Sequence, residues 1–300
     1  ILARRVDQQR QFEQLEQTLA ATEAQLVDVQ NRYEELHHQA DELTRDLAHA
    51  REKRSALRSR HDVLADMENK QQGLDKGVKT LLHQRDEKPY EFAQVAGLVA
   101  DVIKADLEHA KLIETALAGK DQFVIIENAD FLEQQKQALA QLPGPVKFFA
   151  LDLLSPVVNV KDYSGVDGVV GPAAKFVRTE EKFEHLVHLL LGKTVIVRDL
   201  AVALALRRQD AAGMRFLTLD GELIDSDGAV HIGSAKATSG LISRRSELET
   251  LDSQLAELDR EITRLEQLSK QTDQQQRCKN EQAEHGQIPH RLQKQDRLPA

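Results

Sequence analysis

The sequence has few of the residues that several common kinds of functional site require. Aromatic residues make up 4% of the chain and tryptophan is absent, which argues against aromatic stacking platforms for single-stranded nucleic acid. The single cysteine, Cys278, excludes a disulfide framework and a thiolate zinc cluster. No apolar run approaches the roughly 18 residues that span a bilayer, and residues 1–10 hold no apolar signal core. We therefore expect a cytoplasmic protein without a membrane partner, and the initial Ile in place of Met indicates part of a longer chain.

Glycine and proline are absent from long stretches near both ends. Fourteen of the 15 glycines and five of the seven prolines lie within 73–245, whereas 1–72 and 246–285 contain neither. Because these residues punctuate globular folds, the distribution predicts a globular domain over 73–245 between two helical arms, 1–72 and 246–300. Each of the three segments carries a net charge of −3, so anion binding would need a local patch of cations.

Both arms carry apolar residues at heptad spacing. The first seam runs from Phe12 to Leu64 and the second from Leu241 to Leu265. Such seams are typical of coiled coils, and a long solvated helix in some other bundle is the alternative. Because the two seams flank one globular insert, the simplest arrangement is a single antiparallel coiled coil with the insert at its tip.

Pairing the arms outward from the insert predicts which residues are neighbours. Leu64 should lie near Glu249, and Leu36 near Arg277. At about 1.5 Å per residue the first arm is the longer one, so 1–35 would have to pair with a stretch that has lost the seam. We therefore expect the second arm to be irregular beyond about residue 277.

The insert contains two related segments. The run 97–127 matches 171–198 in the order of its glycine, basic, helical and strand positions, with Lys104 corresponding to Arg178. Further on, KFFALD at 147–152 echoes RFLTLD at 215–220. This similarity predicts an internal duplication, and a chance likeness between two α/β units is the alternative.

Each half of the insert predicts the order turn, helix, strand, helix and strand. We therefore divide it into pseudo-repeats at about 73–160 and 161–240, which together form a mixed α/β domain. Asp-Gly pairs at 220–221 and 227–228 predict hairpin turns after the second half. The small residues of 233–240 then form either a flexible linker or a strand-edge dimer contact.

Five runs, in order and at matching separations, carry a specific resemblance. They are GVKTLL at 77–82, VAGLVADVI at 95–103, LLLGKTVIV at 189–197, TLDGELIDSDGAV at 218–230 and SGLISRRSEL at 239–248. With its flanking heptads, the chain resembles the hinge of an SMC (structural maintenance of chromosomes) protein of the bacterial type. The fold this implies is α/β (mixed α+β), a duplicated hinge domain inserted in a long antiparallel coiled coil.

The resemblance implies a doughnut-like homodimer in which the two halves of the hinge make the contacts. By position, the glycines that line such contacts are Gly73, Gly77, Gly233 and Gly240. Ile232 stands where the family usually has a second glycine, a departure that bears on the tightness of the dimer. The resemblance further implies heads that bind ATP and Mg and meet accessory condensin-type subunits, all outside this segment.

Two motifs that could carry catalytic or metal chemistry are incomplete. The GKT at 192–194 resembles the end of a phosphate-binding loop, but Val187 stands where the first glycine should be and a helical run precedes it. His185 and His188 lie three residues apart on an expected helix, without the further ligands that zinc needs. We therefore expect this segment to have no catalytic residue, cofactor or metal, and not to be an enzyme.

A cluster of cations is expected where the two arms leave the domain. Lys76 and Lys79 lie near the first arm, and Lys236, Arg244 and Arg245 near the second. Such a patch would contact DNA phosphates with little sequence preference and in a salt-dependent way. The alternative is that the two arginines pair with acidic residues of the arms.

These observations favour a dimerisation hinge and DNA-contacting module of an SMC-like ATPase that acts in chromosome condensation and segregation, associated with the nucleoid. The alternative is a structural coiled-coil scaffold whose α/β insert binds a protein partner without DNA. An α/β enzyme with helical arms would require a site constellation that the sequence lacks.

Overall fold

A computed structural model describes residues 2–158, 160–209, 213–233 and 240–295, and the side chains of these residues from 9 to 278. The chain forms two compact units. One runs to Ser59 and resumes at Gln254, and the other spans Arg60–Ser253. The α/β unit therefore takes in about a dozen residues of the first arm and eight of the second, beyond the limits of 73 and 245 that the breaker residues indicated.

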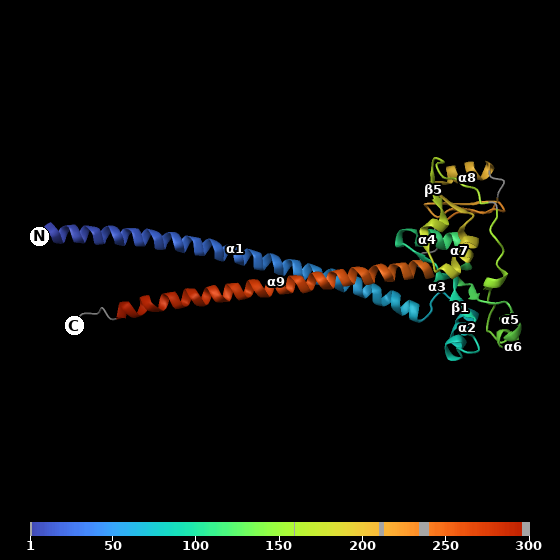
Figure 1. Cartoon of the computed structure of the whole chain (residues 1–300), viewed down its shortest axis with the longest axis horizontal. Coiled ribbons are helices and arrows are strands. Elements are labelled where there is room, and N and C mark those ends of the chain that lie inside the picture. The colour runs from blue at the N-terminus through green and yellow to red at the C-terminus, as the bar shows by residue number, and fades with distance from the viewer. Residues whose placement is uncertain (1, 159, 210–212, 234–239, 296–300) are drawn as a thin grey trace. The chain divides into compact units, whose positions relative to one another are not determined.

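The first unit consists of parts of two long helices, α1 (Leu2–Asn69) and α9 (Leu241–Gln295), which lie side by side (Figure 1). Three interactions join them in antiparallel order: Arg54–Asp259 at 2.5 Å, Arg51–Glu266 at 2.6 Å, and the Gln276 amide to the Leu36 carbonyl at 3.1 Å. The expected pairing of Leu36 with residues around 277 is thus confirmed. Ala50, Leu255 and Leu258 are buried in the seam.

The outer part of this unit differs from the expectation in one respect. Helix α9 continues to Gln295, so the irregular structure expected beyond about 277 is wrong. Loss of an apolar seam removes packing but does not end a helix, because Gln, Glu, Arg and Lys are themselves good helix formers. In α1 the seam residues from Phe12 to Val29 are more than half exposed, in keeping with the missing seam opposite them.

The first half of the hinge unit builds a three-stranded sheet. Its elements are β1 (Val95–Leu98), α3 (Val99–Val102), β2 (Lys104–Ala105), α4 (Leu107–Leu117), η1 (Lys120–Gln122), β3 (Val124–Ile126), α5 (Asp130–Gln134), α6 (Lys136–Ala140), β4 (Phe148–Ala150) and η2 (Leu151–Leu153). The strand order is β1-β3-β4, with β1 antiparallel and β4 parallel to β3. The apolar β3 is fully buried, as expected of a central strand.

The second half repeats this plan. Its elements are β5 (Val169–Pro172), η3 (Ala173–Phe176), β6 (Val177–Arg178), η4 (Glu181–Phe183), α7 (Glu184–Leu191), β7 (Thr194–Val197), α8 (Leu200–Gln209) and β8 (Arg215–Thr218). Strand β5 is antiparallel and β8 parallel to β7, as β1 and β4 are to β3.

The strand register shows that the likeness of the halves is structural. The pairs that correspond are Val95↔Ile126 with Val169↔Val197, Leu98↔Val124 with Pro172↔Val195, and Val124↔Phe148 with Val195↔Phe216. Both edge strands also carry a bulge at the same place, with Gly97 and Gly171 at positive φ. The short strands β2 and β6 join the halves, and Lys104 pairs with Arg178 as their correspondence implied. The internal duplication is therefore confirmed.

The halves differ in what each one adds. The first half begins with helix α2 (Lys76–Glu87), which has no counterpart among the described residues of the second. The second half instead has β9 (Leu223–Ile224) and β10 (Val230–His231), which extend its sheet to the order β10-β9-β8-β7-β5. One core cluster draws residues from both halves, among them Ile113, Ile125, Leu186 and Ile196. Each sheet has a further cluster of its own, which in the first half includes residues of α2.

Arg215, at the start of β8, links the halves by a polar contact. Its Nη1 donates to the Ala116 carbonyl of α4 at 2.7 Å, and its guanidinium pairs with Asp225 at 3.2 Å. Partial burial opposes ionisation of Asp225, yet the Ser226 backbone N–H and the charge of Arg215 hold the pKa of its carboxyl below the ordinary value. The ionised carboxylate therefore stabilises the folded hinge.

We predict that this stabilisation depends on pH in one direction. Because the pKa of Asp225 is lower in the folded chain, its contribution is present above the unfolded value of about 3.9 and is lost as pH falls through the folded value. Urea unfolding should show Asp225→Asn less stable than wild type at pH 7, with a difference that shrinks toward pH 3. An Arg215→Met background should reduce the difference without abolishing it, because the bonds from Ser226 remain, and a difference independent of pH would contradict this assignment.

Candidate dimer and nucleic-acid interfaces

The junction where the arms meet the hinge is held by Arg244, near the start of α9. Its side chain is only 2% exposed and donates from Nε to Glu68 at 2.7 Å. Its two terminal nitrogens donate to the Gln72 carbonyl at 3.1 and 3.0 Å. Arg244 thus ties the last turn of α1, and the turn that follows this helix, to the first turn of α9.

Arg245 extends the same network toward the sheet. It donates to the second oxygen of Glu68 at 2.7 Å and pairs with Asp101 at 2.5 Å. Burial alone would lower the pKa of Arg245, but the charge of Asp101 and the bonds to Glu68 raise it above the ordinary value. Asp101 in turn accepts from the Leu98 N–H at 2.6 Å, which connects the arm root to β1.

The five cations expected to form one patch therefore have different roles. Arg244 and Arg245 pair with acidic residues, one of them in the first arm, as the alternative interpretation of the sequence held. Arg244 in particular is buried and does not face solvent. Lys76 is exposed at the first residue of α2, and half-buried Lys79 donates to the Lys70 carbonyl at 3.4 Å. Lys236 lies outside the described residues.

The four glycines expected at a dimer contact also divide into two pairs. A Cβ at Gly77 would collide with the Gly144 carbonyl, and one at Gly240 would collide with the Glu114 carboxylate. Gly73 and Gly233 instead have positive φ, at 95° and 125°, and nothing would lie within 4 Å of a Cβ added there. Two of the four thus serve close approaches within the chain, and two lie open.

Gly240 allows Glu114 of α4 to cap the second arm. The Glu114 carboxylate accepts from the Ser243 backbone N–H at 2.8 Å and from its hydroxyl at 2.7 Å. A carboxylate at a helix N-terminus satisfies free N–H groups and interacts favourably with the helix dipole. Any side chain at residue 240 would displace this cap.

An apolar strand edge lies directly before Gly233. Val230 and Ile232, in and after β10, are 45% and 68% exposed. Among the described strands, β10 pairs only with β9, so its outer edge is free. A hollow of about 660 Å³ lies between this edge and the C-terminal end of α4. The sequence could not place this hollow, because α4 and β10 are more than 100 residues apart.

The GKT run at 192–194 and His185 have structural roles. Helix α7 ends before Gly192 and β7 begins at Thr194, which is the reverse of the strand-to-helix order of a phosphate-binding loop. His185 Nε2 lies 3.2 Å from the Ser155 carbonyl. Within the described part of the chain, no three potential metal ligands come together, and no helix has the length and apolarity to span a membrane.

Comparison with known proteins identifies the family to which this fold belongs. The family model for the flexible hinge domain of SMC proteins matches residues 92–207. The chain contains an SMC hinge. This match supports the family assignment made from the sequence runs, and it assigns the segment to a class of hinge domains rather than to a class of enzymes.

Curated relatives extend the likeness beyond the hinge. The chromosome partition protein Smc of Rhodopirellula baltica is 33% identical over 219 residues, which cover 70% of this chain and 18% of the relative. That of Bacillus subtilis is 25% identical over 273 residues, covering 89% and 23%. This chain therefore spans only about a fifth of the length of these relatives.

A solved structure supports the fold and the arms together. The SMC hinge domain of Geobacillus stearothermophilus, solved as an asymmetric dimer, is 26% identical with a TM-score of 0.68, covering 80% of this chain and 97% of that one. The expected fold, a mixed α/β hinge with flanking coiled coil, is thus confirmed.

We predict that Arg244 is a structural clamp. Arg244→Met should lower the unfolding free energy by about 3 kcal/mol, because it leaves the Glu68 carboxylate and the Gln72 carbonyl without the buried guanidinium that they bind. Amide hydrogen exchange should rise in the first turns of α9. The control is Arg178→Met, which removes a pair with Asp106 that is 76% and 71% exposed and should cost less than about 1 kcal/mol. Equal effects of the two substitutions would contradict the clamp.

Proposed function

We propose that this chain is the dimerisation hinge of a chromosome-partitioning SMC protein. The observation that carries the proposal is the free, apolar edge of β10 beside the open Gly233, on a fold whose solved relative from Geobacillus stearothermophilus is a dimer of hinge domains. A free edge with exposed aliphatic side chains is a surface that pairs with another strand.

The pseudo-symmetry indicates which strand the partner offers. In the second half, β9 pairs along the outer edge of β8. The counterpart of β8 in the first half is β4, and no described strand covers the outer edge of β4. All three residues of β4 are partly exposed. We infer that β10 of one copy lies beside β4 of the other, so that each first half receives from its partner the strand pairing that the second half makes within the chain.

This pairing closes on itself. Each copy has one β4 edge and one β10 edge, so a two-fold axis generates two equivalent contacts and leaves neither edge free. The result is a ring of two hinges, as the family resemblance implies. Because the two contacts are separate, one can open while the other holds, and a dimer in that state is asymmetric.

We predict that a charge on the β10 edge breaks the dimer. Val230→Lys should weaken self-association at least tenfold, because an edge lysine opposes strand pairing. Light scattering over a concentration series should give twice the chain mass for wild type and a lower mass for the variant.

Val170→Lys is the matched control. Val170 is also 45% exposed and lies on β5, at the opposite edge of the same five-stranded sheet. The Val170→Lys chain should remain dimeric at every concentration at which the wild-type chain is dimeric. A wild-type chain that stays monomeric, or a dimer that either lysine disrupts equally, would overturn the β10 contact.

We further propose that the hinge contacts DNA through phosphates, near the start of α2. With Arg244 and Arg245 engaged in the clamp, the described cations that remain from the expected patch are Lys76 and Lys79, and Lys236 is the third candidate. Their lysine chemistry favours sequence-independent binding. The names of the curated relatives, which are chromosome partition proteins, support a chromosomal role.

We predict that the lysines, and not the arginines, govern DNA affinity. Lys76→Glu with Lys79→Glu should weaken binding of a fluorescent duplex and reduce the slope of log affinity against log salt by about 0.9 for each phosphate that is no longer neutralised. Lys136→Glu with Lys161→Glu, which changes two exposed lysines elsewhere on the hinge, is the control with equal charge. Equal weakening in both double variants would indicate only a general charge effect and would contradict a local site.

In the longer protein, the proposed role of this segment is mechanical. Two hinged chains would hold their arms together at one end while ATP-hydrolysing heads, expected at the far ends with their accessory subunits, change the arrangement of the arms. We expect the longer protein to act in the cytoplasm, on the nucleoid.

A further inference from the structure

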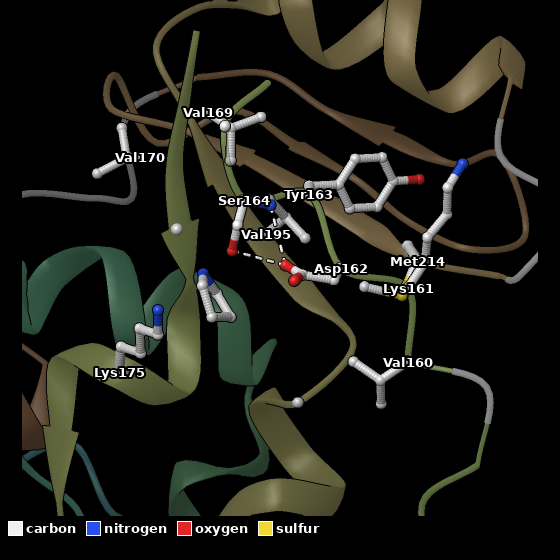
Figure 2. Close-up of a pocket in the computed structure, with 14 residues that line it drawn as sticks. Val160, Lys161, Asp162, Tyr163, Ser164, Val169, Val170, Lys175, Val195 and Met214 are labelled. Carbon is white, nitrogen blue, oxygen red and sulfur yellow. Dashed lines mark hydrogen bonds between the residues drawn. The ribbon is translucent and has the colours of Figure 1, made fainter. Parts of the chain in front are cut away.

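A cavity of about 370 Å³ lies on the second half of the hinge, on the face away from the shared core (Figure 2). Its wall on the sheet side is made by Val169, Pro172, Val195 and Met214. The segment 160–165, which is neither helix nor strand, forms the other side, with Tyr163 packed edge-on against Phe216. None of these residues belongs to the β10 edge or to the arm junction.

The first half has an equivalent of this sheet-side wall, and there helix α2 covers it. By strand register, Val169, Pro172 and Val195 correspond to Val95, Leu98 and Val124. Met214, two residues before Phe216, corresponds to Val146, two residues before Phe148. The equivalents in the first half pack in one cluster with Val78, Leu81 and Leu82. These three residues form the i, i+3, i+4 face of helix α2.

The second half has no helix in the equivalent position. Among the described residues of 155–168, none is helical, and Tyr163 is the one residue of 160–165 that is buried. The consequence is visible in the exposure of the edge strand β5, whereas Val195 and Met214 on the inner part of the wall are buried at 3% and 0%. Val95 and Leu98 are buried at 5% and 1%, whereas Val169 and Pro172 remain half-buried. The cavity is therefore the space that a helix like α2 would fill.

The rim of the cavity carries two lysines and one aspartate. Lys161 and Lys175 point from opposite sides of it, and the Lys161 ammonium lies 4.9 Å from the centre of the Tyr163 ring (Figure 2). Asp162, the acidic residue between them, accepts bonds from both the backbone N–H and the hydroxyl of Ser164. In the described part of the chain, neither lysine is within ion-pair distance of a carboxylate. A ligand with its own carboxylate would complement this rim.

We infer that this cavity is a docking site for an amphipathic helix of a partner protein, with an aliphatic i, i+3, i+4 face toward the sheet and a carboxylate toward Lys175. The partner helix would cover the second sheet as α2 covers the first. Helix α2 of a second copy is a poor occupant, because its aliphatic face is buried in its own chain and its first turn carries Lys76 and Lys79.

The test uses a peptide probe based on α2. It is a labelled peptide of residues 74–88 with Lys76→Glu and Lys79→Glu, stapled through a lactam between Glu87 and a lysine introduced by His83→Lys, both on the exposed side of the helix. The staple matters because so short a helix is marginal in water. Fluorescence anisotropy with the full chain should show saturable binding, and a Leu81→Asp version of the peptide should not bind.

Variants of the chain then locate the site. Lys175→Glu and Val160→Asp, at the mouth of the cavity, should each weaken binding about tenfold, whereas Lys104→Glu, an exposed lysine of the first half, should leave it unchanged. Because all three positions are at the surface, unchanged melting curves would show that the fold is intact. Absence of saturable binding, or binding that all three variants leave unchanged, would overturn the inference. Equally tight binding of the same stapled peptide with Lys76 and Lys79 restored would point to α2 of a second copy as the occupant, which would also overturn it.

Discussion

A β-sheet in water must have its apolar faces covered and its edges either paired or guarded, and the hinge is arranged around that constraint. The two sheets meet this need jointly on one side, where α4 and α7 pack with both of them in the shared core. Fully buried β3 and β7 have no polar face to present, so neither sheet is stable without this common layer. The duplication thus folds as one body, and what remains to be covered is the outer face and the outer edge of each half.

The arm junction depends on a second constraint, the cost of burying charge. Arg244 is tolerated in the interior because Glu68 and the carbonyl of Gln72, just after α1, satisfy its guanidinium. The network does not stop there, since Glu68 also binds Arg245, and Asp101 carries the link to the backbone of β1. A change in the angle between the arm helices at this point would have to break bonds to a buried charge. Small rearrangements are therefore resisted, and the arm roots and the first sheet are expected to move together.

Much of this architecture was predictable from the sequence, for identifiable reasons. The heptad seams and the breaker-free arms gave the antiparallel pairing, down to the proximity of Leu36 and residues around 277. The repeated strand runs gave the duplication, because strand identity is a local property. What the sequence could not give were partners distant in the chain. Glu68 and Asp101 lie well over a hundred residues from the arginines they hold, and nothing local distinguishes Arg244 from an exposed arginine. For the same reason, the sequence could not separate the expected interface glycines into packed and open ones, since only the fold brings Gly144 to Gly77.

The differences between the halves are more informative than their likeness. The first half has α2 over its outer face but leaves the β4 edge open, whereas the second half pairs the β8 edge with β9 and leaves its outer face partly uncovered. Each half therefore lacks an element that the other has. An open edge is satisfied by a strand and an open face by a helix, so the two surfaces require different partners. The cavity is lined by other residues than the β4 and β10 edges, so one surface can be covered without displacing what covers the other. A hinge built in this way can keep its dimer contact and still take up a helix, because the two sites do not share a residue.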